Sequence, residues 1–109
     1  AGCLGQSNST LAVCAEQILS LPLLAAPGTR YAYGGNSMQL AGRIAEVATG
    51  QRWDQLFRAE VAGPLGLSAT DYGFTSSAPG LIEVGNPRIA GGVRSTLDDY
   101  TRFLSALLA

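Results

Sequence analysis

The 109-residue sequence contains neither lysine nor histidine, so all seven basic side chains are arginines. Without histidine, the chain has no Ser-His-Asp or Cys-His nucleophile system and no imidazole metal ligand. Without lysine, it has no Schiff base, no phosphate-binding P-loop lysine and no Ser-x-x-Lys pair. Taken alone, the chain therefore lacks the usual parts of a self-sufficient hydrolase, and we expect neither a metal site nor a cofactor.

Charge and long apolar runs are also scarce. Charged residues make up 14% of the chain and the net charge is −1 at pH 7. Nucleic-acid binding needs a clustered basic face, which these scattered arginines do not supply, so no nucleic-acid partner is expected. The most apolar stretch, residues 18–26, is broken by Pro22 and is much shorter than the ~20 residues of a bilayer span, so no membrane span is expected.

Cys3 and Cys14 are the only cysteines, and their spacing fits neither a metal knuckle nor a C-x-x-C redox pair. A local disulfide would staple the N-terminal loop to the first helix and indicate an oxidising compartment, hence a secreted, periplasmic or cell-envelope protein. The alternative is two reduced thiols, with Cys14 buried on a helix and Cys3 in a mobile tail. A polar tail gives Cys3 little apolar reason to be there, which favours the disulfide. Because the chain starts without Met or a signal peptide, we expect a processed or excised piece.

Apolar spacing and capping residues predict four helices in a single, mainly α domain covering residues 1–109. The helices are expected at residues 11–19, 37–48 and 52–61 and after residue 96. Ser9 or Thr10 suits the N-cap of the first helix, and Thr96 that of the last. Asp98 and Asp99 in the first turn would complement the dipole of the last helix. That helix also carries a broad apolar stripe that needs a neighbour, formed by Leu97, Tyr100, Phe103, Leu104, Leu107 and Leu108.

The helix at residues 37–48 is expected to be capped by Asn36 or Ser37 and to end before a left-handed Gly50. Arg43 and Glu46 are expected to face outward. The stripe expected to face the core consists of Met38, Ala41, Ile44, Ala45 and Ala48.

The helix at residues 52–61 is expected to be stopped by Gly63-Pro64-Leu65-Gly66, because Pro64 cannot continue the hydrogen-bond ladder. Asp54 and Glu60, together with Arg58, are interpreted as a solvated face. From residue 68 to 88 no period survives, and short strands are expected only near residues 72 and 82. A long irregular segment in a compact domain usually carries function or packs against something absent.

Four segments, in order, resemble a known family. Pro27-Gly28-Thr29-Arg30-Tyr31-Ala32-Tyr33-Gly34-Gly35, followed by Leu40 and Gly42, resembles the region around the catalytic tyrosine of serine β-lactamase-related hydrolases. Residues 50–57 resemble the helix that follows it. Residues 63–67 resemble the family's "PLGM" turn, and residues 90–103 its "AGGLxST…D…RF" helix start. The family contains class C β-lactamases, D-Ala-D-Ala carboxypeptidases of the penicillin-binding-protein type and lactamase-like esterases.

The resemblance implies that the chain is the helical lobe of the serine β-lactamase or penicillin-binding-protein-like fold. In that family an α/β domain carries a Lys/His-Thr-Gly box, and the nucleophilic serine and its lysine lie upstream of the tyrosine segment. This sequence contains neither motif. It therefore looks like part of a larger two-domain bacterial hydrolase, whose remainder is the expected partner. The parent would hydrolyse a small-molecule ester or amide through an acyl-serine intermediate.

The resemblance carries over one catalytic residue, Tyr33, as a general base or relay beside the serine and lysine. A tyrosine has an ordinary pKa of about 10, which such cations must lower for this role. The alternative is an aromatic side chain that packs its ring and hydrogen-bonds its hydroxyl.

The family's motif is often Tyr-x-Asn, with the Asn contacting the substrate amide. Here that position is Gly35, and Asn36 comes one residue late, either as a weak substrate contact or as a helix N-cap. This departure favours an esterase-like parent.

Two classes of function remain open. In the first, the chain is part of a hydrolase and is inactive alone because its nucleophile is absent. In the second, it is a non-enzymatic helical binding or assembly module, or a pseudoenzyme, whose exposed apolar faces pair with a second copy or another protein.

Overall fold

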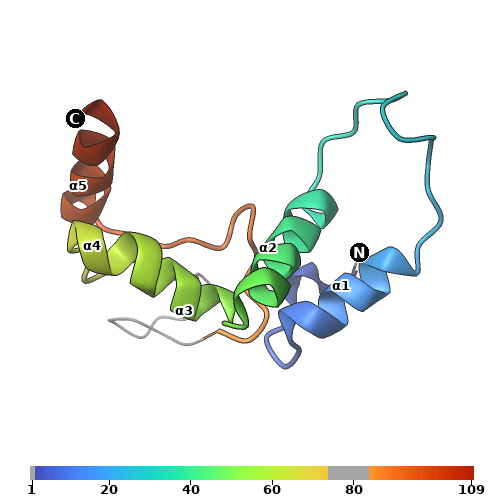
Figure 1. Cartoon of the computed structure of the whole chain (residues 1–109), viewed down its shortest axis with the longest axis horizontal. Coiled ribbons are helices and arrows are strands. Elements are labelled where there is room, and N and C mark those ends of the chain that lie inside the picture. The colour runs from blue at the N-terminus through green and yellow to red at the C-terminus, as the bar shows by residue number, and fades with distance from the viewer. Residues whose placement is uncertain (1, 74–83) are drawn as a thin grey trace.

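The computed structural model describes residues 2–73 and 84–109, and these residues are arranged as helices joined by loops (Figure 1). The elements are η1 (Gly2–Gly5), α1 (Leu11–Leu19), α2 (Asn36–Thr49), α3 (Trp53–Phe57), η2 (Arg58–Ala62), α4 (Gly63–Leu65) and α5 (Leu97–Leu108). In the described ranges, extended pairing is limited to an isolated antiparallel bridge between Asp71 and Arg94. The mainly α prediction is confirmed. The strand expected near residue 72 is reduced to this bridge, and the one near residue 82 lies outside the described residues.

Helix α1 begins and ends where the sequence indicates. Thr10 is its N-cap, and its hydroxyl accepts a hydrogen bond from the backbone N–H of Val13 at 3.2 Å. A disulfide joins Cys14 on its buried face to Cys3 in the short 3-10 turn η1, with 5.3 Å between the two Cα atoms. The predicted disulfide is therefore present, and it holds the start of the chain against α1.

Helix α2 packs against α1, but the prediction of its buried face is wrong. The side that faces inward carries Gln39, Gly42 and Glu46, while Ile44 is 68% exposed. A side chain at Gly42 would meet Ile89, because an ideal Cβ there lies 2.6 Å from Ile89 Cγ1. The glycine thus allows a close approach that no bulkier residue allows, and the polar residues on either side satisfy backbone groups of neighbouring segments.

Both ends of α2 also bear on the sequence predictions. The N-cap is Gly35, which has no side chain to form a capping hydrogen bond, and Asn36 is the first residue of the helix. The prediction that Asn36 or Ser37 serves as the cap is therefore wrong by one residue. Gly50 closes the other end with φ 69°, the left-handed conformation that glycine adopts without penalty.

Helix α3, the π-turn η2 and α4 form one continuous rod that runs to Leu65, so the predicted end near residue 61 is too early and Pro64 does not stop the helix. The N–H of Gly63 donates to the carbonyl of Arg58, five residues back. This wider turn is a π-bulge directly before Pro64, and such a bulge accommodates a proline that would break regular α-helix. The rod ends at Gly66, whose φ of 67° is again left-handed.

Helix α5 stands beside α4 at one end of the molecule, and the loop between α1 and α2 projects at the other end (Figure 1). Thr96 is its N-cap, as predicted, with the hydroxyl accepting from the N–H of Asp99 at 3.2 Å. The apolar stripe of α5 is largely exposed, since Leu97, Leu107 and Leu108 are each more than 60% accessible. The neighbour that this stripe needs does not occur within the described part of the chain.

Candidate functional site

Tyr33 lies on the long loop that joins α1 to α2, residues 20–35, which we call the tyrosine loop. Its side chain is 94% exposed, and that of Tyr31 on the same loop is 85% exposed. The loop turns at Gly28, where the N–H and the hydroxyl of Thr29 both donate to the carbonyl of Ala26. The ring of Tyr33 is thus not packed as a core aromatic, and its hydroxyl lies in the open.

Gly35 and Asn36, the other two residues singled out beside Tyr33, form the junction between the tyrosine loop and α2. Both are half-buried. An ideal Cβ built on Gly35 lies 3.2 Å from Leu4 Cδ1, so the space that a side chain would fill is occupied by η1. The structure therefore brings Gly35 and Asn36 to the base of the loop that bears Tyr33.

A buried amide pair holds three segments together just behind this junction. Gln39 donates to Asn86 Oδ1 at 3.2 Å and to the carbonyl of Pro87 at 2.7 Å, and its own oxygen accepts from the N–H of Ile89. Asn86 in turn donates to the carbonyls of Cys3 and Gln6 at 2.8 and 3.0 Å. The start of the chain, α2 and the loop after residue 84 are thereby linked through two side chains.

Buried carboxylates fix the remaining elements. Glu46, predicted to face outward, is only 8% exposed because its Oε2 accepts the N–H of Trp53 at 2.8 Å while Oε1 pairs with Arg43. It therefore satisfies a free backbone donor at the N-terminus of α3, where the helix dipole also favours negative charge.

Asp54, predicted to lie on a solvated face, is also buried. Arg52 donates to both of its oxygens at 3.2 and 3.0 Å, and the N–H of Val84 donates to Oδ2 at 3.3 Å. A carboxylate with charge-assisted partners and a backbone donor is stable in such a position. The prediction of a solvated Asp54 is therefore wrong.

Two further aspartates join the region after α4 to the start of α5. Arg94 forms a two-pronged pair with Asp71, at 2.6 and 3.0 Å, and this pair lies over the backbone bridge between the same two residues. The hydrogen bond to Asp71 raises the pKa of Arg94 above its ordinary value. Asp99 accepts from the N–H of Ala69 and the hydroxyl of Thr70.

A small pocket lies beside these aspartates, with room for about one water molecule. It is lined by Asp54, Phe57, Arg58, Ala62, Thr70, Asp71 and Tyr72. The rings of Trp53 and Phe57 meet Tyr72 edge to face, with centroids 5.8 and 5.2 Å away. Burial raises the pKa of Tyr72, and the Trp53 indole partly opposes this. Trp53 Nε1 has no partner of hydrogen-bond geometry in the described residues, so burial dominates. None of the tyrosine-loop residues lines this pocket.

Two findings concern the described residues as a set. Residues 2–73 and 84–109 contain no group of three His, Cys, Asp or Glu side chains placed to hold a metal ion. Within the same ranges, no helix has the length and apolar character needed to cross a membrane.

Comparison with known proteins assigns the chain to a family. The family model described as β-lactamase matches residues 5–109. The chain belongs to the β-lactamase family. A comparison with curated proteins gave no match.

A solved structure supports the same assignment. The crystal structure of a candidate β-lactamase from Bacteroides dorei DSM 17855 is 38% identical in sequence and superposes with a TM-score of 0.76. The match covers 93% of this chain and 29% of that one, so the chain spans less than a third of its relative's length. The helical arrangement described above therefore corresponds to one part of a β-lactamase-family fold.

Sequence reasoning found the tyrosine loop of this β-lactamase-family chain through its motif, but it missed the polar residues that hold the loop's surroundings. Gln39 and Asn86 belong to no motif and are 47 residues apart. Nothing in the sequence close to either residue indicates that its side chain is buried. Such a residue becomes informative only when its partner is known.

Proposed function

We propose that this chain forms one wall of the active site of a serine hydrolase, with Tyr33 as the general base or relay of the acylation step. Its membership of the β-lactamase family supports a hydrolase, and the observation that carries the role of Tyr33 is its placement. The hydroxyl stands free on a projecting loop, at the position where the family motif has its tyrosine.

The chemistry requires groups from sequence outside these 109 residues. A serine hydroxyl transfers its proton toward Tyr33 as its oxygen attacks the carbonyl carbon of the substrate. The leaving group departs with a proton, and water then cleaves the acyl-serine ester to regenerate the hydroxyl. The chain itself supplies no lysine to sustain the tyrosine as a base. We therefore expect the isolated chain to be inactive.

The substrate class follows from Gly35. In the family motif the side chain at this position carries the amide that contacts an amide substrate. Gly35 has no such side chain, and an ideal Cβ there would lie against the apolar Leu4, 3.2 Å from its Cδ1. A neutral, apolar surface at this point supports an ester substrate over a β-lactam or peptide.

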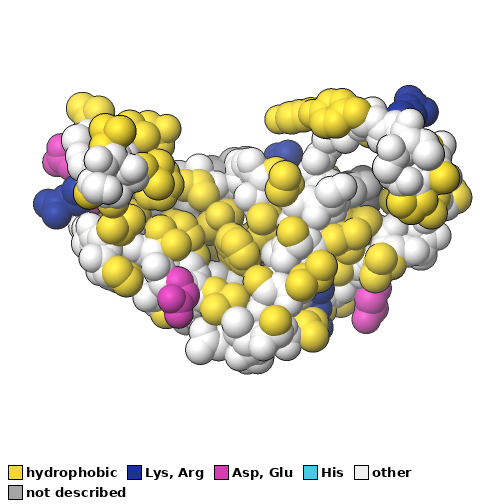
Figure 2. Space-filling view, turned by 45° about the horizontal axis from the view of Figure 1, so that its top comes forward, with side chains coloured by type: hydrophobic (Ala, Val, Ile, Leu, Met, Phe, Trp, Pro, Cys, Tyr) yellow, Lys and Arg dark blue, Asp and Glu magenta, His cyan; other side chains and the backbone are white. Residues whose placement is uncertain are grey.

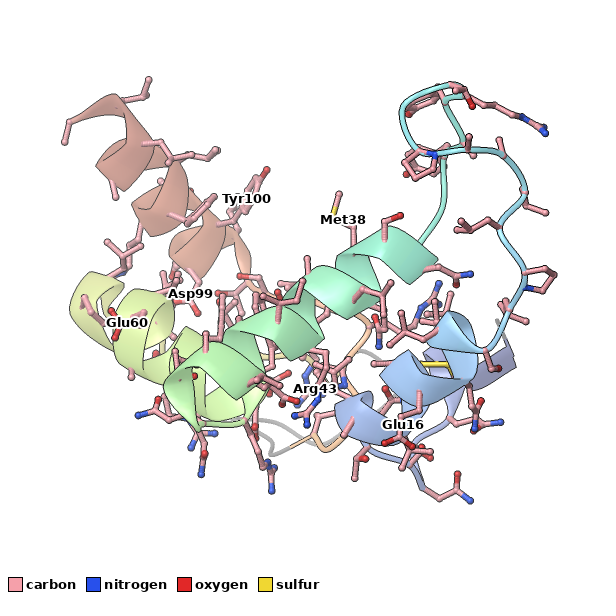
Figure 3. All side chains as sticks on the ribbon, turned by 45° about the vertical axis from the view of Figure 1, so that its right-hand side comes forward. Glu16, Met38, Arg43, Glu60, Asp99 and Tyr100 are labelled. Carbon is pink, nitrogen blue, oxygen red and sulfur yellow. A yellow bond between two sulfur atoms is a disulfide. The ribbon has the colours of Figure 1, made fainter. Side chains whose placement is uncertain are left out.

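The remainder of the hydrolase would cover the hollowed face between α5 and the tyrosine loop. Figure 2 shows apolar side chains gathered along this face. Figure 3 shows Met38 of α2 and Tyr100 of α5 projecting on the same side of the molecule, and both are more than half exposed. Exposed apolar surface of this extent is typical of a protein interface. The disulfide supports a secreted, periplasmic or cell-envelope location.

The test of this proposal uses two proteins. The 109-residue chain is incubated with a chromogenic cephalosporin and a p-nitrophenyl ester, and its mass is then measured. We expect no turnover and no acyl adduct, and either one would contradict the claim that the chain is inactive alone.

In the longer polypeptide that carries the nucleophile, Tyr33→Phe should lower kcat/KM for the ester by about 10²–10⁴-fold, the usual contribution of a general base. Tyr31→Phe is the matched control, since Tyr31 lies on the same loop with similar exposure. Equal activity of the two variants would overturn the role of Tyr33.

A second candidate function is a helical binding or assembly module, possessing no catalytic role. The exposed stripe of α5 favours it, because Leu97 and Leu108 are both more than 80% accessible. Light scattering after size exclusion separates the two functions. A folded species of defined stoichiometry supports a module, and a poorly folded or aggregating chain supports a part of a hydrolase.

A further inference from the structure

Both ends of the tyrosine loop are attached to one buried cluster. The cluster consists of the Cys3–Cys14 disulfide and Ile18, with Leu4 and Leu40 packed against it. Ile18 lies just before the loop leaves α1, and the N–H of Leu21 donates to its carbonyl at 3.1 Å. The loop returns at Gly35, directly beneath Leu4.

The contact between Leu4 and Gly35 is close. An ideal Cβ on Gly35 would lie 3.2 Å from Leu4 Cδ1 and 4.0 Å from Cδ2. The φ of Gly35 is −86°, so its backbone would accept any L-residue. The absence of a side chain therefore serves the contact and not the backbone conformation, because it lets the isobutyl group of Leu4 rest on the backbone where the loop meets α2.

The backbone next to Leu4 is fixed by the disulfide and by hydrogen bonds. Its neighbour Cys3 is fully buried in the disulfide, and the turn is closed by the N–H of Gln6 donating to the carbonyl of Cys3 at 3.1 Å. The same carbonyl accepts from Asn86 at 2.8 Å. Since Asn86 accepts from Gln39 of α2, η1 is fixed both to α1 by a covalent bond and to α2 by hydrogen bonds. The disulfide crossing beneath α1 is visible in Figure 3.

We infer that Leu4 is a positioning residue for Tyr33: held by the disulfide and Asn86, it clamps the backbone of Gly35, two residues after the tyrosine, and so restricts where the hydroxyl can lie. The functional meaning of the clamp rests on the proposed role of Tyr33. The clamp itself is a property of the loop and can be measured without substrate.

The first experiment measures amide hydrogen exchange in the 109-residue chain, comparing Leu4→Ala with wild type. Removing the isobutyl group leaves Gly35 without its cover. The amides at the start of α2, above all that of Gln39, which donates to the carbonyl of Gly35 at 2.9 Å, should then exchange about tenfold faster, while those of α5 keep their wild-type rates. Leu4→Met, which refills the space, should restore slow exchange. Leu24→Ala is the control, because Leu24 lies on the same loop and is 83% exposed.

A second variant keeps the inference testable if Leu4→Ala does not fold. Gly35→Ala places a methyl group against Leu4 and should speed exchange at the same amides. If both single variants fold, the double variant Leu4→Ala, Gly35→Ala should be no worse than Leu4→Ala alone, because the clash is then gone. Unchanged exchange at Gln39 in the folded variants, or equal acceleration in α5, would overturn the clamp.

The link to catalysis is tested in the longer polypeptide. There Leu4→Ala should lower kcat for the ester at least about tenfold, while amide exchange in α5 stays at the wild-type rate. Leu4→Met should restore kcat. If the exchange results hold but Tyr33→Phe leaves activity intact, the proposed function fails and the clamp stands. If Tyr33→Phe abolishes activity but Leu4→Ala leaves exchange and kcat unchanged, the clamp fails and the proposed function stands.

Discussion

Asp98 and Asp99 are adjacent residues in the first turn of α5, yet their carboxylates have different surroundings. Asp98 is exposed, whereas Asp99 is buried and accepts from the N–H of Ala69 and the hydroxyl of Thr70, at 2.8 and 2.7 Å. Both carboxylates interact favourably with the dipole of α5. The difference in stability between variants at the two positions therefore measures the tertiary hydrogen bonds of Asp99.

Replacing Asp99 should therefore cost far more stability than replacing its neighbour. Asp99→Ala leaves the half-buried N–H of Ala69 without its acceptor and the Thr70 hydroxyl with Ser95 as its remaining partner, so it should lower the free energy of unfolding by about 1–3 kcal/mol. Asp98→Ala loses only an exposed dipole interaction, worth less than about 1 kcal/mol. Urea unfolding of both variants measures the difference, and equal losses would show that Asp99 acts only through the dipole.

Tyr72 gives the protein an alkaline dependence of stability that is unusually easy to observe. The sequence has no lysine and both cysteines form the disulfide, so tyrosines are the side chains that titrate between about pH 9 and 12. Burial raises the pKa of Tyr72 above its ordinary value of 10.0. Above pH 10 the unfolded chain therefore loses a proton that the native chain still holds, and stability falls as the pH rises.

Tyr72→Phe should flatten this alkaline fall, whatever it does to stability at neutral pH. The measurement is denaturant unfolding between pH 8 and about 11.5. Tyr31→Phe serves as the control for the loss of a tyrosine hydroxyl, because Tyr31 is 85% exposed. A slope that persists in Tyr72→Phe would show that another group causes it.

At the scale of elements, the rod from α3 to α4 depends on Gly63. An ideal Cβ there lies 2.8 Å from the carbonyl oxygen of Arg58, the acceptor of the π-turn. Because this contact is with backbone, Gly63→Ala must distort the turn and should lower the free energy of unfolding by about 1–3 kcal/mol. Gly91→Ala, where nothing lies within 4 Å, is the matched control and should be nearly neutral. Stabilisation by Gly63→Ala would mean that the rod relaxes to regular α-helix.

The sequence predicted the ends of elements better than their buried faces. Caps are local, so Thr10, Gly50 and Thr96 were sufficient to place the limits of α1, α2 and α5. The buried face of α2 depends on distant partners. Gln39 is buried because Asn86 and Pro87 meet it, and nothing within a few residues indicates this. Apolar periodicity instead pointed to the side that the described residues leave open.

The candidate site shows the same division. The motif singled out Tyr33, which the structure places on an exposed loop, and its catalytic role stays a prediction. The contact of Leu4 with Gly35 was not foreseeable, since 30 residues separate the two positions and a glycine is most simply explained as a turn residue. Close packing against a glycine is visible only in three dimensions.

At the scale of the whole molecule, the described residues form an open shape of 42 × 32 × 26 Å with an apolar hollow between its two ends (Figure 2). The core around the disulfide is small, and α5 is attached mainly through Asp71, Asp99 and α4. Much apolar surface therefore stays in water. A chain in this state gains free energy by covering it, either with the rest of a hydrolase or with a second copy.

Self-association of the isolated chain should consequently depend on α5. Leu104 and Leu107 are exposed, and replacing both with Gln should reduce the weight-average mass toward that of the monomer at little cost in stability. Leu23 and Leu24 are the matched control, because they expose at least as much apolar surface but lie on the tyrosine loop. Light scattering over a range of concentrations measures both double variants. A wild-type chain that remains monomeric throughout, or equal effects of the two double variants, would show that the stripe of α5 is not what drives association. A selective effect of the α5 variant would identify the stripe of α5 as the surface through which the isolated chain associates.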